Sequence, residues 1–153
     1  MKFFRLLFIF FVAVFSLQSC KKEYSELWKE EVKTTESVKI TDISGDYFNS
    51  AISLQEFKVK YPWFQGTVPD EDYSQRRKDT AERRIYKEAV QKIDKAKLQQ
   101  DLSVLFSRVR HYFPKFKTPQ VYLYSSSLQS VLDPVFFSPE ERMLFVDMSA
   151  FMG

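Results

Sequence analysis

The chain has 153 residues, a formal net charge of +3 and one cysteine. Two of its 23 basic residues, Lys2 and Arg5, lie at the very start, and without them 21 basic residues face 20 acidic ones, a net charge of +1. This near balance argues against a general binder of nucleic acid or of acidic surfaces. The length allows one domain with a real hydrophobic core and is short for two.

The first 19 residues have the order of parts found in a signal peptide. Lys2 and Arg5 form a positive start, an apolar run follows from Leu6 to Val14, and Ser19 is a small residue at a plausible cleavage point. The run is shorter than the roughly 20 residues that a helix needs to cross a bilayer. We therefore interpret residues 1–19 as a cleaved signal peptide and not as a permanent transmembrane helix.

Cys20 follows this segment directly. The sequence Leu17-Gln18-Ser19-Cys20 resembles the bacterial lipobox, in which the cysteine becomes the lipidated first residue of the mature protein. We expect Cys20 to be the lipidation site; the alternative is an ordinary signal peptide with an accidental cysteine there. Residues 20–37, rich in Lys and Glu, are predicted to be a tether between the lipid and the domain.

Residues 38–153 are predicted to form a single domain that begins with an extended segment and continues with helices. Ser53 and Glu56 have the spacing of a capping box and predict a helix over 54–61, stopped by Pro62. Acidic residues at 70–72 predict the start of a second helix, because the helix dipole favours negative charge there. Asp79 predicts a further start, and apolar residues at helical spacing predict two long helices around 81–93 and 98–113.

After Pro119 the composition changes to that of strands. The segments 120–124, 135–137 and 143–147 are rich in β-branched and aromatic residues. The predicted fold class is therefore α+β, a helical N-terminal half followed by a small antiparallel sheet. Because the chain stops soon after a strand, we also expect it to be truncated before further helices that cover the sheet.

Few residues suggest catalysis. His111 is the only histidine, the three glycines are too few for a phosphate-binding loop, and the nucleophile, zinc-protease and nucleotide-binding motifs are absent. We predict no catalytic, cofactor-binding or metal-binding residue and identify no small-molecule substrate, with His111 interpreted as structural or solvent-facing. The basic run that follows Asp70 to Asp72 could bind a polyanion, but a solvated helix face with internal ion pairs is favoured. Residues 125–127, three serines, are interpreted as a loop.

Two segments share one pattern, Lys60-Tyr61-Pro62-Trp63-Phe64 and His111-Tyr112-Phe113-Pro114-Lys115-Phe116. In each, a proline is expected to stop a helix while the neighbouring rings pack into the core.

These two segments resemble the gliding motility lipoprotein GldB family of Bacteroidetes. The resemblance also includes the lipobox, Tyr112 to Val121, Lys78-Asp79-Thr80 and Val146-Asp147-Met148. The resemblance covers the chain from about Val38 to Gly153, and proteins of that family are longer than this chain. It implies a lipid-anchored protein of the cell envelope, on the periplasmic side or in the outer membrane. Its partners would be other envelope proteins of the gliding and protein-secretion machinery.

The resemblance supplies no catalytic residues. An alternative hypothesis is a lipoprotein similar to metallopeptidases whose catalytic site lies beyond residue 153. A third is an envelope lipoprotein of unrelated role, such as a binding module that uses exposed aromatic residues around Trp63.

Overall fold

The computed structural model describes residues 32–34, 36–64, 68–127 and 133–152. Within these residues, the secondary structure begins with strand β1 (Ile40–Asp42) and helices α3 (Ile43–Phe48) and α4 (Leu54–Lys60). A short 3-10 turn η1 (Pro62–Phe64) leads to helices α5 (Asp70–Lys78), α6 (Thr80–Lys92) and α7 (Lys95–Tyr112). Strands β2 (Gln120–Tyr124), β3 (Val135–Ser138) and β4 (Met143–Asp147) and the 3-10 turn η2 (Met148–Phe151) follow. The signal peptide, Cys20 and most of the tether lie outside the described residues.

The helices begin where short polar side chains can accept hydrogen bonds from free backbone N–H groups. Ser53 and Glu56 form the predicted capping box at the start of α4. The carboxylate of Asp79 accepts from the N–H groups of Ala81 and Glu82 and starts α6, and Asp94 accepts from Lys97 N and starts α7. These starts are local in origin, which is why the sequence predicts those of α4 and α6. α7 begins at Lys95, before the predicted start near residue 98, and α3 was not predicted as a helix.

The sheet is mixed, with the strand order β1-β2-β4-β3. β1 pairs parallel with β2, β2 pairs parallel with β4, and only β3 and β4 are antiparallel. The α+β class is confirmed, while the expectation of an antiparallel sheet is wrong for two of the three pairings. The reason lies in the connections between the strands. Helices α3 to α7 lie between β1 and β2 in the sequence, and such a long crossover allows parallel pairing. β3 and β4, in contrast, are joined by a tight turn, which favours antiparallel pairing.

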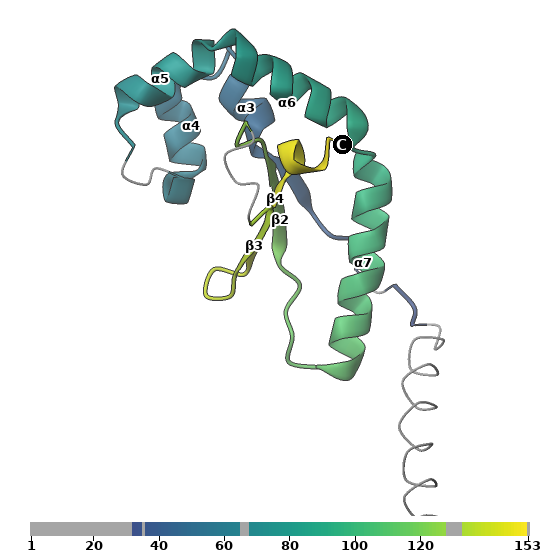
Figure 1. The fold of residues 1–153 in the computed structure, drawn as a ribbon. Helices are drawn as coiled ribbons and strands as arrows, with labels where there is room; N and C mark the ends of the chain where they lie inside the picture. The colour runs from purple at the N-terminus through teal and green to yellow at the C-terminus, as the bar shows by residue number, and fades with distance from the viewer. Residues whose placement is uncertain (1–31, 35, 65–67, 128–132, 153) are drawn as a thin grey trace, which may run out of the picture. The chain divides into compact units, whose positions relative to one another are not determined.

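Helices lie on the two faces of this sheet (Figure 1). On one face, Tyr122 and Phe145 pack with an aromatic cluster built around Phe57 and Tyr61. On the other face, β2 and β4 contribute Val121, Leu123, Leu144 and Val146 to a second cluster that includes residues of α6 and α7. Successive side chains of a strand point to opposite faces, so both faces of β2 are apolar and buried.

Asp42, at the end of β1, holds several elements together. Its carboxylate accepts hydrogen bonds from the hydroxyl of Tyr86 on α6 (3.0 Å), from Lys95 Nζ on α7 (2.6 Å) and from Gly45 N on α3 (2.9 Å). A Cβ at Gly45 would lie 3.0 Å from the Tyr86 hydroxyl, so a side chain there would require this hydroxyl to shift. Burial, together with the negative charge of Asp42, raises the pKa of Tyr86.

Candidate functional site

Strand β3 carries the most exposed apolar surface of the sheet. The exposed fractions are 51% for Val135, 56% for Phe136 and 44% for Phe137, three consecutive large apolar residues. Such surface is normally buried in a core or against another molecule, so a continuous exposed run marks a candidate interaction site. We refer to Val135, Phe136 and Phe137 as the β3 patch.

The register of the sheet places the β3 patch on both faces. Phe136 is opposite Phe145, on the face of the aromatic cluster, whereas Val135 and Phe137 are opposite Val146 and Leu144, on the other face. β3 is an edge strand, so the helices that cover the centre of the sheet leave it accessible on both faces (Figure 1). An apolar run without alternation predicts a strand buried on both faces; here the strand has that composition at an exposed edge.

The backbone of β3 is also available along its outer side. Asp147 N donates to Pro134 O (2.8 Å), which makes these two residues a hydrogen-bonded pair of the antiparallel ladder. Such pairs alternate with non-hydrogen-bonded ones, so the backbone groups of Phe136 also face β4, while those of Val135 and Phe137 face away from it. Among the described residues, no strand pairs with this outer side.

Phe136 is the exposed end of a row of aromatic rings that leads into the core. Its ring stacks on Phe145 with centroids 6.0 Å apart, and Phe145 stacks on Tyr122 at 5.5 Å. The ring of Trp63 lies edge-on to that of Phe145 at 5.2 Å and is tilted against that of Tyr122 at 4.9 Å. The hypothesis of an exposed aromatic site around Trp63 therefore needs a correction: Trp63 is partly buried and supports the row, and the accessible ring is that of Phe136.

Acidic residues flank the β3 patch at both ends. Asp133 precedes it, and Glu140 and Glu141 follow it in the turn to β4, where Ser138 Oγ donates to Glu141 Oε2 (3.2 Å). The only base in this turn is Arg142, which has a positive φ of 55°. The patch is thus an apolar centre between two negative ends.

The strand at 135–137 was predicted from the sequence, but its exposure was not. One available signal was the pair of prolines, Pro134 and Pro139, that bound it. Proline lacks a backbone N–H and is found mainly on edge strands or at their ends. An apolar run between two prolines therefore favours an edge position over a central one.

Next to β3, the carboxylate of Asp147 at the end of β4 accepts hydrogen bonds that connect it to the loop after β2. Asp147 is fully buried and accepts from Ser126 N (3.2 Å), Ser149 N (3.0 Å) and Ser149 Oγ (2.6 Å), and also from Ser126 Oγ. Ser125 N donates to Ser44 Oγ (2.8 Å), which joins the same loop to α3. The predicted serine loop at 125–127 is confirmed, and its contacts are those of a structural anchor.

The two proline-containing segments differ. In the first, Tyr61 is buried and Trp63 and Phe64 pack against the aromatic cluster, as predicted. In the second, α7 ends at Tyr112, but Tyr112 and Phe113 are 43% and 66% exposed, and only Phe116 packs inward, against Phe106 at 5.8 Å. The prediction that the rings of both segments enter the core is wrong for Tyr112 and Phe113, because they lie at the end of a helix whose buried face is provided by earlier turns.

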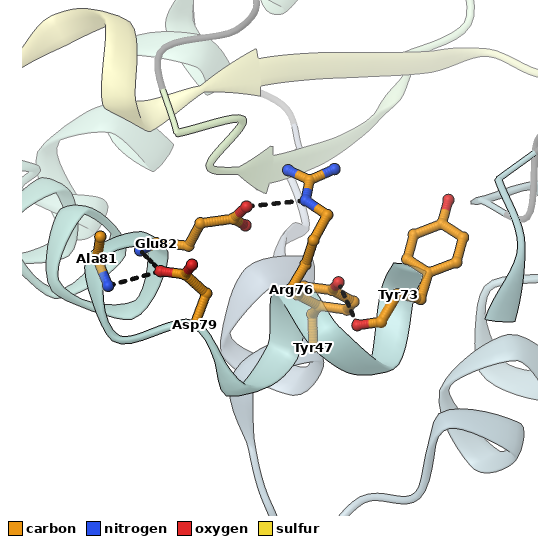
Figure 2. A network of polar contacts seen from close by, with 6 residues as sticks. All are labelled: Tyr47, Tyr73, Arg76, Asp79, Ala81 and Glu82. Atoms are coloured by element: carbon orange, nitrogen blue, oxygen red, sulfur yellow. Dashed lines mark hydrogen bonds and ion pairs between the residues drawn. The ribbon is translucent and has the colours of Figure 1, made fainter. Parts of the chain in front are cut away.

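The charged run from Asp70 onward makes internal contacts (Figure 2). Arg76 Nε donates to Glu82 Oε1 (2.9 Å), and Arg77 donates to backbone carbonyls of Asn49 and Ile52. The Glu82 hydrogen bond raises the pKa of Arg76, although burial opposes it. Arg77 lines an open hollow of about 340 Å³ together with Lys78, Arg83, three serines and apolar residues of α3 and α4. These contacts agree with the interpretation of a solvated face with internal pairs.

The remaining sequence predictions concern chemistry. His111 is exposed, in line with a solvent-facing role, and its ring contacts that of Tyr112 at 4.9 Å. Within the described ranges, no three His, Cys, Asp or Glu residues are grouped so that they could hold a metal ion. In the same part of the chain, no helix is both long and apolar enough to span a membrane. Lipidation at Cys20 and the domain boundaries at 19/20 and 37/38 stay predictions.

Comparison with known proteins places the sequence in a family. No curated protein and no solved structure matches the chain significantly. Residues 25–153 match the family described as gliding motility protein GldB, and this range contains every helix and strand described above. The chain, a small mixed sheet between helices with one exposed aromatic edge strand, therefore belongs to the GldB family of gliding motility proteins.

Proposed function

We propose that this protein is a lipid-anchored component of the cell envelope that serves the gliding motility and protein secretion machinery without catalysing a reaction. Its role is to hold a domain at the membrane and to contact other envelope proteins. Membership of the GldB family supports the link to gliding motility and to the envelope. The observation that carries the contact role is the β3 patch, an exposed apolar strand at the edge of the sheet.

Cys20 supplies the anchor in this proposal. Signal peptidase cleavage before Cys20 and acylation of that residue would leave the charged segment 21–37 as a spacer between lipid and domain. Two or three acyl chains on one residue anchor a protein stably, because each buried CH₂ contributes about 0.8 kcal/mol and one chain alone is marginal. A spacer rich in Lys and Glu stays hydrated and extended, which lets the domain reach partners away from the lipid surface.

A Cys20→Ala substitution tests the anchor. In cells grown with an alkyne-tagged palmitate analogue, the wild type should carry the label and sediment with membranes, whereas the variant should lose the label and gliding should fail. Ser19→Gly is the matched control, because it keeps a small residue at the cleavage point and should leave labelling intact. The proposal is wrong if the Cys20→Ala protein remains membrane-bound and the cells glide normally.

A second experiment tests the contact role separately. Phe136→Ser and Phe137→Ser remove exposed aromatic surface and should reduce gliding while labelling and membrane association stay normal. Val59→Ser on α4 is the control, since Val59 is also apolar and is 82% exposed. Equal gliding in all three variants would contradict a role for the β3 patch.

A further inference from the structure

We propose that the outer edge of β3 binds an extended segment of another protein, which adds to the sheet as a fifth strand and has basic residues on both sides of an apolar centre. This inference rests on the proposed function and deepens it, because it states the binding mode and the chemistry of the partner. In strand addition, main-chain hydrogen bonds provide affinity and side chains on alternate positions provide specificity.

The backbone of β3 meets the requirement for such addition. The N–H and C=O groups of Val135 and Phe137 face away from β4, as the hydrogen bond from Asp147 N to Pro134 O establishes. Pro134 and Pro139 limit the strand to four residues, so a partner can pair only with this short window. The side chains of the patch then lie on both faces of the added strand and can pack with its apolar residues.

Charge argues against a second copy of this chain as the occupant. Two copies related by a two-fold axis would pair their β3 strands antiparallel. Outward-facing residues must lie opposite outward-facing ones, so such a pair is centred either on Phe136 or on Phe137. In the register centred on Phe136, Pro139 lies opposite Asp133, and Asp133 of each copy lies beside the acidic turn of the other. In the register centred on Phe137, Asp133 lies opposite Glu141 and Pro139 lies opposite Val135. Like charges directly opposite each other destabilise a strand pair, and prolines cannot donate to the ladder.

The same charges favour a partner with lysine or arginine at its ends. Asp133 lies at one end of the patch, and Glu140 and Glu141 lie at the other, so either strand direction brings basic ends close to acidic ones. The apolar centre selects for valine, isoleucine or aromatic residues in between. The structure thus defines the recognised segment as a short extended stretch with a basic–apolar–basic pattern.

The first test uses two synthetic peptides and the full chain in a non-ionic detergent. Each peptide has five alternating valines and threonines, flanked by two lysines at each end in one and by two glutamates at each end in the other. Fluorescence anisotropy should show the lysine-ended peptide binding about tenfold more tightly, the ratio that two exposed ion pairs of ordinary strength produce. Equal affinities, or no binding of either peptide, would overturn the proposal.

A variant in which the acidic residues beside the β3 patch are replaced by basic ones tests the charge preference most directly. Asp133→Lys combined with Glu140→Lys should reverse the preference, so that the glutamate-ended peptide binds more tightly. The control pair described next makes the same change in net charge, so a reversal seen only in the Asp133 and Glu140 variant would not arise from non-specific charge attraction. The control pair, Glu71→Lys with Asp72→Lys on exposed positions of α5, should keep the preference of the wild type.

The backbone contribution is tested at one position. Phe137→Pro and Phe137→Ala both remove the ring, but only proline also removes the outward N–H, and proline is tolerated at such positions of edge strands. We expect Phe137→Pro to weaken peptide binding at least about fivefold beyond Phe137→Ala, the loss of one hydrogen bond of ordinary strength. Equal affinity of the two variants would mean that binding uses side chains only and would refute strand addition.

A photo-crosslinker at position 137 of the full-length protein in cells identifies the natural occupant. A crosslink to a basic–apolar–basic segment of a different protein supports the proposal, whereas crosslinks within the same chain or to a second copy overturn it. Gliding that depends on Phe137 while the peptides fail to bind would leave the proposed function standing and refute only this binding mode.

Discussion

Replacement of Asp147 by alanine should destabilise the domain strongly. Asp147 is fully buried, and its two carboxylate oxygens accept four hydrogen bonds from Ser126 and Ser149. Alanine removes all four acceptors at the point where the loop after β2, the end of β4 and the turn η2 meet.

The magnitude follows from the two backbone donors. Buried N–H groups that lose their acceptor cost about 1–3 kcal/mol each, and the two hydroxyl bonds to a charged acceptor add to this. We therefore expect Asp147→Ala to lower the free energy of unfolding by about 4 kcal/mol, a large part of the roughly 5–15 kcal/mol that domains possess. Asp147→Asn keeps the oxygen that accepts three of the bonds, so its cost should be about 1–2 kcal/mol.

Urea unfolding of the full chain in a mild detergent, followed by aromatic fluorescence, measures these differences. Asp101→Ala is the control: Asp101 is exposed and forms an ion pair with Lys97 on the same helix, so its replacement should leave the midpoint nearly unchanged. The proposed role of Asp147 would be refuted if Asp147→Ala unfolded at the urea concentration of the wild type, or if Asp147→Asn were as damaging as Asp147→Ala.

Three further predictions concern the aromatic cluster and its polar rim. Phe57→Ala should cost about 3–5 kcal/mol in urea unfolding, because Phe57 is buried among aromatic rings, whereas Val59→Ala on the same helix should stay within about 0.5 kcal/mol. Ser53→Ala should cost about 1 kcal/mol by removing the cap of α4; an unchanged midpoint would contradict the capping box. Burial raises the pKa of Asp46, but hydrogen bonds from Lys60 and Tyr61 outweigh it and hold this pKa below its ordinary value. Ionised Asp46 therefore stabilises the fold at neutral pH, and the deficit of Asp46→Asn should shrink as pH falls below about 4; a constant deficit would contradict the pair.

The starts of α4 and α6 were accessible from sequence because their causes are local. Ser53, Asp79 and Asp94 each bond to N–H groups two or three residues away, so the neighbouring residues alone decide where α4, α6 and α7 begin. The strand at 120–124 was equally clear, since Val121 and Tyr122 belong to a short β-branched and aromatic run after a proline. The segment 135–137 was predicted as a strand for the same reason.

The candidate site depended on residues far apart in the sequence. Whether Phe136 and Phe137 are buried is decided by the position of β3 in the sheet and by which helices reach it, and neither is encoded in the strand itself. The exposure of Phe113 was missed for a related reason: the spacing of apolar residues shows that α7 has a buried face, but not where along the helix its neighbours end.

By itself, the sequence determined the class of the fold, the starts of α4, α5 and α6, the GldB resemblance and the prediction that Cys20 carries a lipid. Each of these conclusions depends on the types and spacing of residues that are close together in the sequence. Only the tertiary structure decided that β1 pairs with β2 in parallel, that Asp147 joins two strand ends, and that β3 is an edge strand with no partner on its outer side among the described residues. Strand pairing and burial are properties of long-range contacts, because each depends on which distant segments fill the space beside a residue.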